Sequence, residues 1–293
     1  MQKITPFLWY DKNAHDAAKL YVSAFKNSKI DKLSILSDTP SGDVEVVSAE
    51  LMGAKFTLMG CPRRSDFTPA VSYIVACDTK EEVDAIWAKL SQGGAVLMQL
   101  GEYPFSQHYG WLNDKYGVSW QITLPGEPKM KHALTTSLLF VGAMCGKAED
   151  AINLYRSIFR ESSIGEILRY GKGEGPDREG TVKWASFTLE DQGFAVMDSA
   201  LDHKFAFSEA NSFLVRCESQ EEIDHFWSKL APSPEAGQCG WVTDRYGITW
   251  QVVPDILDTL LADKDKRKVA RVVDAFVKMK KFVIEDLEKA YKG

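Results

Sequence analysis

The sequence has few of the side chains that bind metal ions or cross-link a chain. Its 293 residues include five cysteines and five histidines, and no CxxC motif occurs. The cysteines are scattered, at Cys61, Cys77, Cys145, Cys217 and Cys239. An odd and scattered set of cysteines is typical of reduced thiols rather than of a disulfide framework or a zinc site. We therefore expect free thiols that fill core positions.

An excess of positive charge and a long apolar run are also missing. The formal net charge is −6 at pH 7, which argues against a nucleic-acid-binding surface. No apolar run approaches the roughly 20 residues that a membrane-spanning helix needs. The amino terminus lacks the apolar stretch of a signal peptide. These observations predict a cytoplasmic protein with no nucleic-acid partner and no membrane partner.

What the sequence does contain is one long segment written twice. The stretch GWLNDKYGVSWQ at residues 110–121 returns as GWVTDRYGITWQ at 240–251. Upstream, residues 77–90 return with similar spacing as residues 217–230. A repeat of this length is a domain rather than a short solenoid unit. We expect a first domain at 1–125, a linker at 124–131, a second domain at 132–254 and a helical tail at 255–293.

Hydrophobic periodicity predicts a βαβββ order in each half of the first domain. The first half is predicted as strand 4–10, helix 14–25 and strands 30–37, 44–52 and 55–59. The second half is predicted as strand 71–77, a helix that begins at the capping box Thr79–Glu82, and strands near 96–100, 110–113 and 119–124. The second domain is expected to match element by element, beginning with strand 134–141. The tail is predicted as one amphipathic helix from about 266 to 291, packed on the protein itself or across a dimer interface.

The paired βαβββ modules and the duplicated Trp-x-x-Asp-x-x-Gly-x-x-Trp-Gln motif resemble the vicinal oxygen chelate superfamily. This superfamily includes glyoxalase I, extradiol dioxygenases and the fosfomycin and bleomycin resistance proteins. Within it, residues 1 to about 254 resemble most the branch labelled 3-demethylubiquinone-9 3-methyltransferase. The resemblance implies an α+β fold of two tandem glyoxalase-like domains, each with a concave mixed sheet.

The resemblance also implies where a metal ion would bind. Metal-using members hold one divalent ion with His or Gln from first strands and Glu from last strands. In this chain the first-strand positions fall near Pro6, Ser72, Thr136 and Ser212, and the last-strand positions fall on Gln121 and Gln251. These side chains are neutral, and proline offers no donor, so we expect no metal ligands and no cofactor. The alternative is a divalent metal bound by a different set of residues.

What remains is a neutral, hydrogen-bonding pocket in each domain, suited to a small neutral or weakly polar molecule. The expected ligand-binding residues are Tyr10, Ser72 and Gln121 in the first domain and Phe140, Ser212 and Gln251 in the second. The alternative interpretation is that the two glutamines hold strand ends by hydrogen bonds. No catalytic residue is predicted.

Three functional hypotheses follow. The first is a small-molecule-binding protein, with the question of catalysis left open. The second is a metal-dependent isomerase, lyase or transferase that acts on a quinone-like or thiol-conjugated substrate. The third is a scaffold that acts through its tail. The repeat suits either a monomer that is an internal pseudo-dimer or a homodimer. Methyl transfer itself is not indicated, because no glycine-rich strand-to-helix turn for a nucleotide-like methyl donor is visible.

Overall fold

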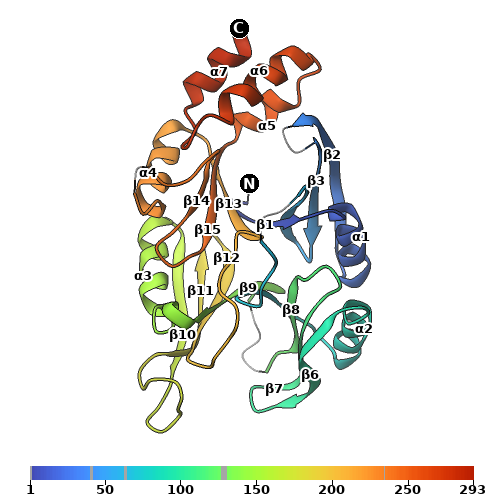
Figure 1. Cartoon of the computed structure of the whole chain (residues 1–293). Helices are drawn as coiled ribbons and strands as arrows, with labels where there is room; N and C mark the ends of the chain where they lie inside the picture. Colours follow the sequence, from blue (N-terminus) through green and yellow to red (C-terminus); the bar gives the residue numbers. More distant parts are fainter. Residues whose placement is uncertain (1, 40–41, 63–64, 127–130, 234) are drawn as a thin grey trace. The chain divides into compact units, whose positions relative to one another are not determined.

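The computed structural model describes residues 2–39, 42–62, 65–126, 131–233 and 235–293 (Figure 1). The strands are β1 Ile4–Tyr10, β2 Lys29–Thr39, β3 Gly42–Leu51, β4 Ala54–Gly60, β5 Val71–Ala76, β6 Ala95–Tyr103, β7 Ser106–Asn113, β8 Ser119–Leu124, β9 Leu134–Val141, β10 Ser162–Arg169, β11 Val182–Leu189, β12 Gln192–Ser199, β13 Asn211–Cys217, β14 Trp241–Thr243 and β15 Thr249–Pro254. The helices are α1 Ala14–Ala24, α2 Lys80–Leu90, the short 3-10 turn Gly142–Met144, α3 Ala148–Ile158, α4 Gln220–Leu230, α5 Ile256–Leu261, α6 Lys266–Phe276 and α7 Ile284–Lys292. The α+β fold class is therefore confirmed, and each strand and helix predicted for the first domain is present. Part of the predicted linker, residues 127–130, lies outside the described residues.

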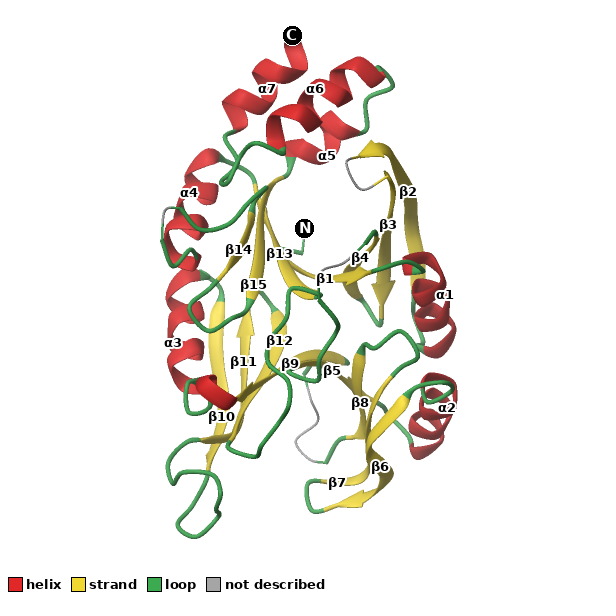
Figure 2. Cartoon of the chain, viewed as in Figure 1, coloured by secondary structure: helices red, strands yellow, loops and turns green. Residues whose placement is uncertain are grey.

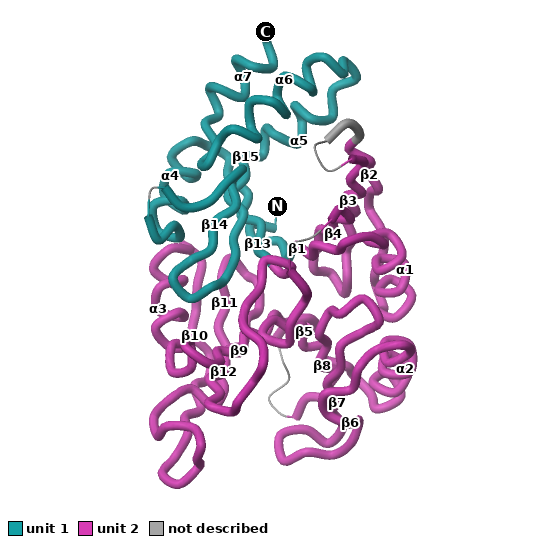
Figure 3. The backbone as a smooth tube through the Cα atoms, in the orientation of Figure 1, with its two compact units in different colours: residues 1–6, 212–293 teal, residues 7–211 magenta. Residues whose placement is uncertain are grey.

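Contacts divide the chain into two compact units (Figure 3). One contains Met1–Pro6 and Ser212–Gly293, and the other contains Phe7–Asn211. These units cut across the two sequence repeats, because each repeat contributes to both. The domain boundaries expected at 1–125 and 132–254 describe the duplicated sequence and differ from these contact units. As domain boundaries they stay a prediction.

An eight-stranded sheet forms the centre of the larger unit. Its strand order is β10-β11-β12-β9-β5-β8-β7-β6 (Figure 2). Strand β5 pairs in parallel with β8, and β9 pairs in parallel with β12. The two halves join where β5 and β9 pair antiparallel, with Ser72 opposite Ser137. The second half of one repeat and the first half of the next therefore build a single sheet.

One face of this sheet is covered by helices. Helix α2 packs on β7, where the Trp87 ring lies so close to Gly110 that a Cβ there would be 2.4 Å from it. Helix α3 packs on β11 and β12, and the backbone N–H groups of Gly146 and Ala148 at its start donate to Asp198. The strand registers put Gly110 and Asp198 on the same face, because side chains alternate along each strand. The opposite face carries neither helix.

The remaining strands form smaller groups within each unit. In the larger unit β1 pairs in parallel with β4, and β4, β3 and β2 follow as antiparallel neighbours, with α1 packed on β3. In the smaller unit β15 lies between β14 and β13, and α4 packs on β15. There the backbone N–H of Arg216 donates to the carbonyl of Lys3, so the first residues of the chain extend this group. No described helix has the length and apolar character needed to cross a bilayer.

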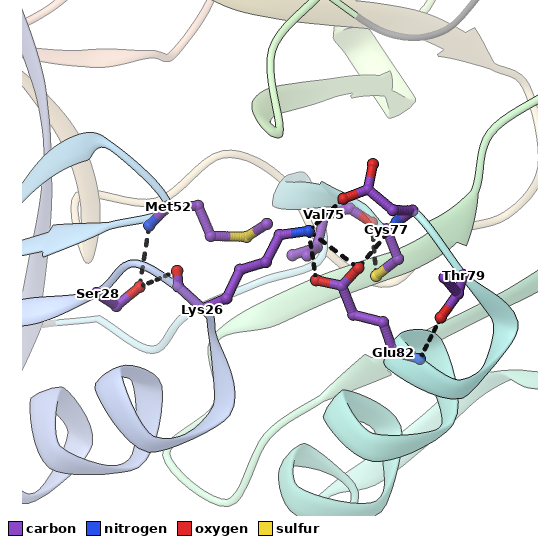
Figure 4. Close-up of polar contacts among 8 residues, drawn as sticks. Lys26, Ser28, Met52, Val75, Cys77, Thr79 and Glu82 are labelled. Carbon is purple, nitrogen blue, oxygen red and sulfur yellow. Dashed lines mark hydrogen bonds and ion pairs between the residues drawn. The ribbon is translucent and has the colours of Figure 1, made fainter.

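The capping box predicted for α2 is present and is reinforced by a lysine (Figure 4). The Thr79 hydroxyl accepts from the Glu82 backbone N–H at 3.2 Å, and the Glu82 carboxylate accepts from the Asp78 N–H at 2.8 Å. Lys26, just after α1, bonds both acidic side chains. The second copy repeats this arrangement, because Ser219 caps α4 and Lys3 bonds Glu222 at 2.7 Å. Both copies thus tie a lysine to the start of the second helix of the repeat.

The prediction of a single tail helix is wrong. Helix α6 ends at Phe276 and α7 begins at Ile284, and the segment between them pairs with the second repeat. The Cys239 and Gly240 N–H groups donate to the carbonyls of Met279 and Lys280 at 2.8 and 2.7 Å. A continuous helix would use those carbonyls internally, so this pairing interrupts it.

The expected match of the second repeat in every element is also wrong at one place. From Leu90 to Trp111 the first repeat advances 111 − 90 = 21 positions, whereas from Leu230 to Trp241 the second advances 241 − 230 = 11. The additional residues build the β6–β7 hairpin of the first repeat. In the described part of the second repeat, the short strand β14 stands at this place, beside the tail segment.

Candidate functional site

Gln121 is the centre of a buried hydrogen-bond network in the eight-stranded sheet. Its Oε1 accepts from the Tyr109 hydroxyl at 2.8 Å. Its Nε2 donates to the Ser72 Oγ at 2.8 Å and to the Ser137 Oγ at 3.4 Å. Strands β7, β8, β5 and β9 each supply one member of this network. The expected pairing of Gln121 with Ser72 is therefore observed, and its role in ligand binding stays a prediction.

The network lies on the sheet face that α2 and α3 leave open. Alternation along β8 puts Gln121 and Thr123 on this face and Trp120 and Ile122 under the helices. Gln121 and Thr123 each keep 7% of their surface exposed, whereas Trp120 and Ile122 are at 0%. On the same face Trp111 and Asn113 of β7 and Met197 of β12 are only partly buried, so solvent reaches parts of this face, while Gln121 itself is nearly covered.

This open face has no charged side chain on its five central strands. The positions concerned are Tyr109, Trp111 and Asn113 on β7, Ser119, Gln121 and Thr123 on β8, Ser72, Ile74 and Ala76 on β5, Thr135, Ser137, Leu139 and Val141 on β9, and Gly193, Ala195, Met197 and Ser199 on β12. Hydroxyl, amide and indole groups alternate there with apolar groups. We refer to this set of positions as the open face.

An aromatic cluster adjoins the network at the β6–β7 hairpin. The ring centroids of Tyr103 and Phe105 lie 5.6 and 5.0 Å from that of Tyr109, and both contacts are edge-to-face. Tyr103 and Phe105 stack on each other at 5.7 Å. Burial raises the pKa of the Tyr109 phenol above its ordinary value of 10.0, which favours the protonated form that donates to Gln121. Phe105 is 63% exposed, which is unusual for a phenylalanine.

In the second repeat the corresponding pair is Gln251 and Ser212. The Gln251 Nε2 donates to the Ser212 Oγ at 2.9 Å, and both side chains are buried. The position that Tyr109 occupies in the first repeat holds Cys239 in the second. The thiol of Cys239 lies instead against the Val277 carbonyl of the tail, at 3.5 Å. The two copies have thus kept the glutamine–serine pair and differ in the residues around it.

Tyr10 and Phe140 do not join these networks. The Tyr10 hydroxyl hydrogen-bonds Tyr21 of α1 at 3.0 Å, and its ring contacts Phe67. Phe140 lies three residues from Ser137 on β9, so it projects to the helix-covered face, where its ring contacts Phe207. Neither residue is a neighbour of the glutamine in its own unit. Their assignment as ligand contacts has no support from these positions.

Sequence reasoning missed two members of the network, Tyr109 and Ser137. Ser137 stands one residue after the predicted first-strand position Thr136, and a register shift by one residue moves a side chain to the other face. Tyr109 directly precedes the repeated motif, but its counterpart is cysteine, so the repeat gave no signal. The neighbouring His108 points to the helix-covered face, where its Nε2 lies 2.7 Å from Asp84 of α2.

The aspartate of the repeated motif has a structural role in both copies. Asp114 accepts from the indole N–H of Trp120 and the Tyr21 hydroxyl, both at 2.8 Å, and from two backbone N–H groups of its own turn. Asp244 accepts from Trp250 and from its turn in the same way. The motif therefore fixes the turn between two strands, and its first and last residues, Trp111 and Gln121, lie opposite each other on the open face.

Comparisons with known proteins agree with this architecture. The family model of 3-demethylubiquinone-9 3-methyltransferase matches twice, at residues 2–123 and 132–253. A Bacillus cereus protein of solved structure with the same description, also called PhnB protein, is 43% identical, with a TM-score of 0.40. The match covers 42% of this chain and 99% of that one.

Two longer matches come from glyoxalase I variants of Zea mays. They are 12% and 11% identical, with TM-scores of 0.51 and 0.50. They cover 86% and 84% of this chain and 94% and 92% of theirs, which shows a shared fold. The search of curated proteins found no match. Since the family model covers both repeats, the chain belongs to the 3-demethylubiquinone-9 3-methyltransferase family.

Proposed function

We propose that this chain is a small-molecule-binding protein that holds an uncharged ligand against the open face, around Gln121. The observation that supports this most is the absence of charge on the five central strands of that face, together with its contact with solvent. A face lined by amide and hydroxyl groups orients a ligand by hydrogen bonds and gives a charged ligand no counter-ion.

The donor set of the open face does not fit the divalent ion that the fold family implies. Zinc, iron and similar ions are held by His nitrogen, Cys sulfur or Asp and Glu oxygen. Around Gln121 the available donors are two serine hydroxyls, a phenol and the amide itself. Within the described residues, no three His, Cys, Asp or Glu side chains gather as a metal site. We therefore propose binding without a metal at this face and derive no reaction step through one.

The same proposal extends to assembly and location. The pairing of β5 with β9 joins the two repeats in one sheet, which supports a monomer that is an internal pseudo-dimer. All five cysteines are free thiols, as expected for a reducing compartment such as the cytoplasm.

The test is ligand-detected NMR with two mixtures of fragments, one uncharged and one of carboxylates and amines. We expect hits in the uncharged mixture that disappear in Gln121→Ala and persist in Gln251→Ala. The second variant is the matched control, because it removes the same amide from the other repeat. The proposal would be contradicted if only charged fragments bind, or if the uncharged fragments bind Gln121→Ala as well as they bind the wild type.

A further inference from the structure

The last groups in the Gln121 network are the hydroxyls of Ser72 and Ser137. Tyr109 donates to Gln121, and Gln121 donates to Ser72 and Ser137, so both serine oxygens act as acceptors. Each hydroxyl still carries one proton to donate. Among the described residues, the structure shows no acceptor for either proton. A buried donor without an acceptor is costly, so an oxygen placed there from outside would be stabilising.

The two protons lie close together. Ser72 and Ser137 are direct partners across the β5–β9 pair, where Cβ atoms of opposed residues are about 4.5–5.5 Å apart. Both residues are nearly fully buried, at 2% and 1% exposure. Two hydroxyl donors at this spacing can converge on one oxygen atom with two lone pairs.

The aromatic cluster supplies the second half of a recognition site. Tyr109 connects the two halves, because its hydroxyl bonds Gln121 and its ring contacts Tyr103 and Phe105. The exposed Phe105 offers a ring surface that the protein leaves to solvent. Flat aromatic molecules pack on such rings in stacked or edge-to-face geometry.

Given the binding function proposed above, we propose that the ligand class is a planar aromatic molecule that carries a neutral carbonyl oxygen. The oxygen accepts hydrogen bonds from Ser72 and Ser137, and the ring lies against Tyr109 and Phe105. A carboxylate or phosphate is disfavoured, because the central strands of the open face offer no positive charge to a buried anion.

The second repeat cannot form this site. It lacks the residues of the β6–β7 hairpin, and Cys239 stands in the place of Tyr109. The inference therefore assigns the site to the Gln121 copy alone.

The experiment uses three probes measured by NMR titration on the full chain. They are 1-acetonaphthone, 1-ethylnaphthalene, which keeps the rings and lacks the oxygen, and cyclohexyl methyl ketone, which keeps the carbonyl and lacks the aromatic rings. We expect 1-acetonaphthone to bind about three- to tenfold more tightly than either other probe, as the loss of one hydrogen bond or one aromatic contact implies.

Two variants separate the contributions. Phe105→Leu should weaken 1-acetonaphthone and 1-ethylnaphthalene about threefold or more and leave cyclohexyl methyl ketone unchanged. Ser137→Ala should weaken both ketones and leave 1-ethylnaphthalene unchanged. Leu201→Ala is the control, because Leu201 is 55% exposed and lies outside the network and the aromatic cluster. Thermal melts of each variant confirm that it is folded.

Equal binding of the three probes, or no effect of Phe105→Leu and Ser137→Ala, would overturn the inference. If uncharged fragments bind in a Gln121-dependent manner while 1-acetonaphthone does not, the aromatic carbonyl class is wrong and the proposed function stands. If no uncharged fragment depends on Gln121, both are wrong.

Discussion

Asp114 shows how much of this fold rests on a single buried side chain. It accepts hydrogen bonds from one indole, one phenol and two backbone N–H groups, and it is 3% exposed. In Asp114→Asn, the NH₂ group of the asparagine would replace one carboxylate oxygen and would face hydrogen-bond donors instead of accepting from them. We expect Asp114→Asn to lower the free energy of unfolding by about 1–3 kcal/mol, measured by urea denaturation. Asp11→Asn, at an exposed position, is the control, and equal losses in both variants would contradict this account.

Cys77 gives a prediction for alkaline pH. Burial raises the pKa of its thiol to about 12, from an ordinary value of 9.0. The folded state therefore retains a proton that the unfolded state loses, so this contribution is fully present below pH 9 and falls as the pH rises toward 12. The stability advantage of wild type over Cys77→Ala should shrink by about 1 kcal/mol or more between pH 8.5 and 10.5. Urea denaturation at the two pH values measures it.

The second repeat provides the check on that result. Cys217 has the same position and a pKa raised to about 12 by burial. Cys217→Ala should therefore show the same pH trend, and a difference from wild type that stays constant with pH would argue against buried thiols as the cause.

At this scale the sequence predicted local chemistry well. The capping box at Thr79 and the Gln121–Ser72 pair were both found, because repeat spacing and strand alternation determine them. Ser137 could not be found in this way, because its approach to Gln121 depends on the pairing of β9 with β5, which is a contact between repeats.

At the scale of secondary-structure elements, the segment between α6 and α7 packs closely against the second repeat at Gly240. Gly240 has a φ of +78°, and a Cβ there would lie 2.4 Å from the Phe282 ring and 2.9 Å from the Val252 carbonyl. We expect Gly240→Ala to displace the segment between α6 and α7 and to make it the first site of limited proteolysis. Gly101→Ala is the control, because nothing lies within 4 Å of its added Cβ. An unchanged cleavage pattern would contradict the docking of this segment.

Both errors in predicting elements arise where the tail pairs with the second repeat, which is a contact between segments that are distant in the sequence. Residues 266–291 have helical periodicity, yet the carbonyls of Met279 and Lys280 are used by the second repeat, so tertiary pairing overrides propensity. The missing hairpin of the second repeat is visible in the sequence as ten fewer positions. Its replacement by the tail is not visible there, because the two segments are distant along the chain.

For the whole molecule, the junction between β5 and β9 leads to a prediction about half-chains. The β5 strand is buried on both sides, and without residues 132–293 it would lose its antiparallel partner. An unpaired, apolar strand edge favours association with another chain. We expect a chain of residues 1–131 to form a homodimer in which β5 pairs with its copy, measured by light scattering after gel filtration. A folded monomer would contradict this expectation.

The fold class could be predicted for the whole chain, because duplication and the repeated motif identify it. The way in which the modules combine could not, since the repeat boundary says nothing about which halves share a sheet. The sequence shows that the residues of the open face are uncharged. Only the strand registers show that these residues lie together on one face of the sheet.

The division of the chain into units has a consequence for the order of events during synthesis. The larger unit, Phe7–Asn211, is continuous, so all its strands are synthesised before Ser212–Gly293. The smaller unit joins the first residues to Ser212–Gly293 and includes the hydrogen bond from Arg216 to Lys3. Because chains are made from the amino terminus, the strands of the open face can pair before the smaller unit, which cannot form until Ser212–Gly293 has been synthesised. Premature termination after residue 211 would therefore leave a nearly intact Gln121 site with an unpartnered amino-terminal segment.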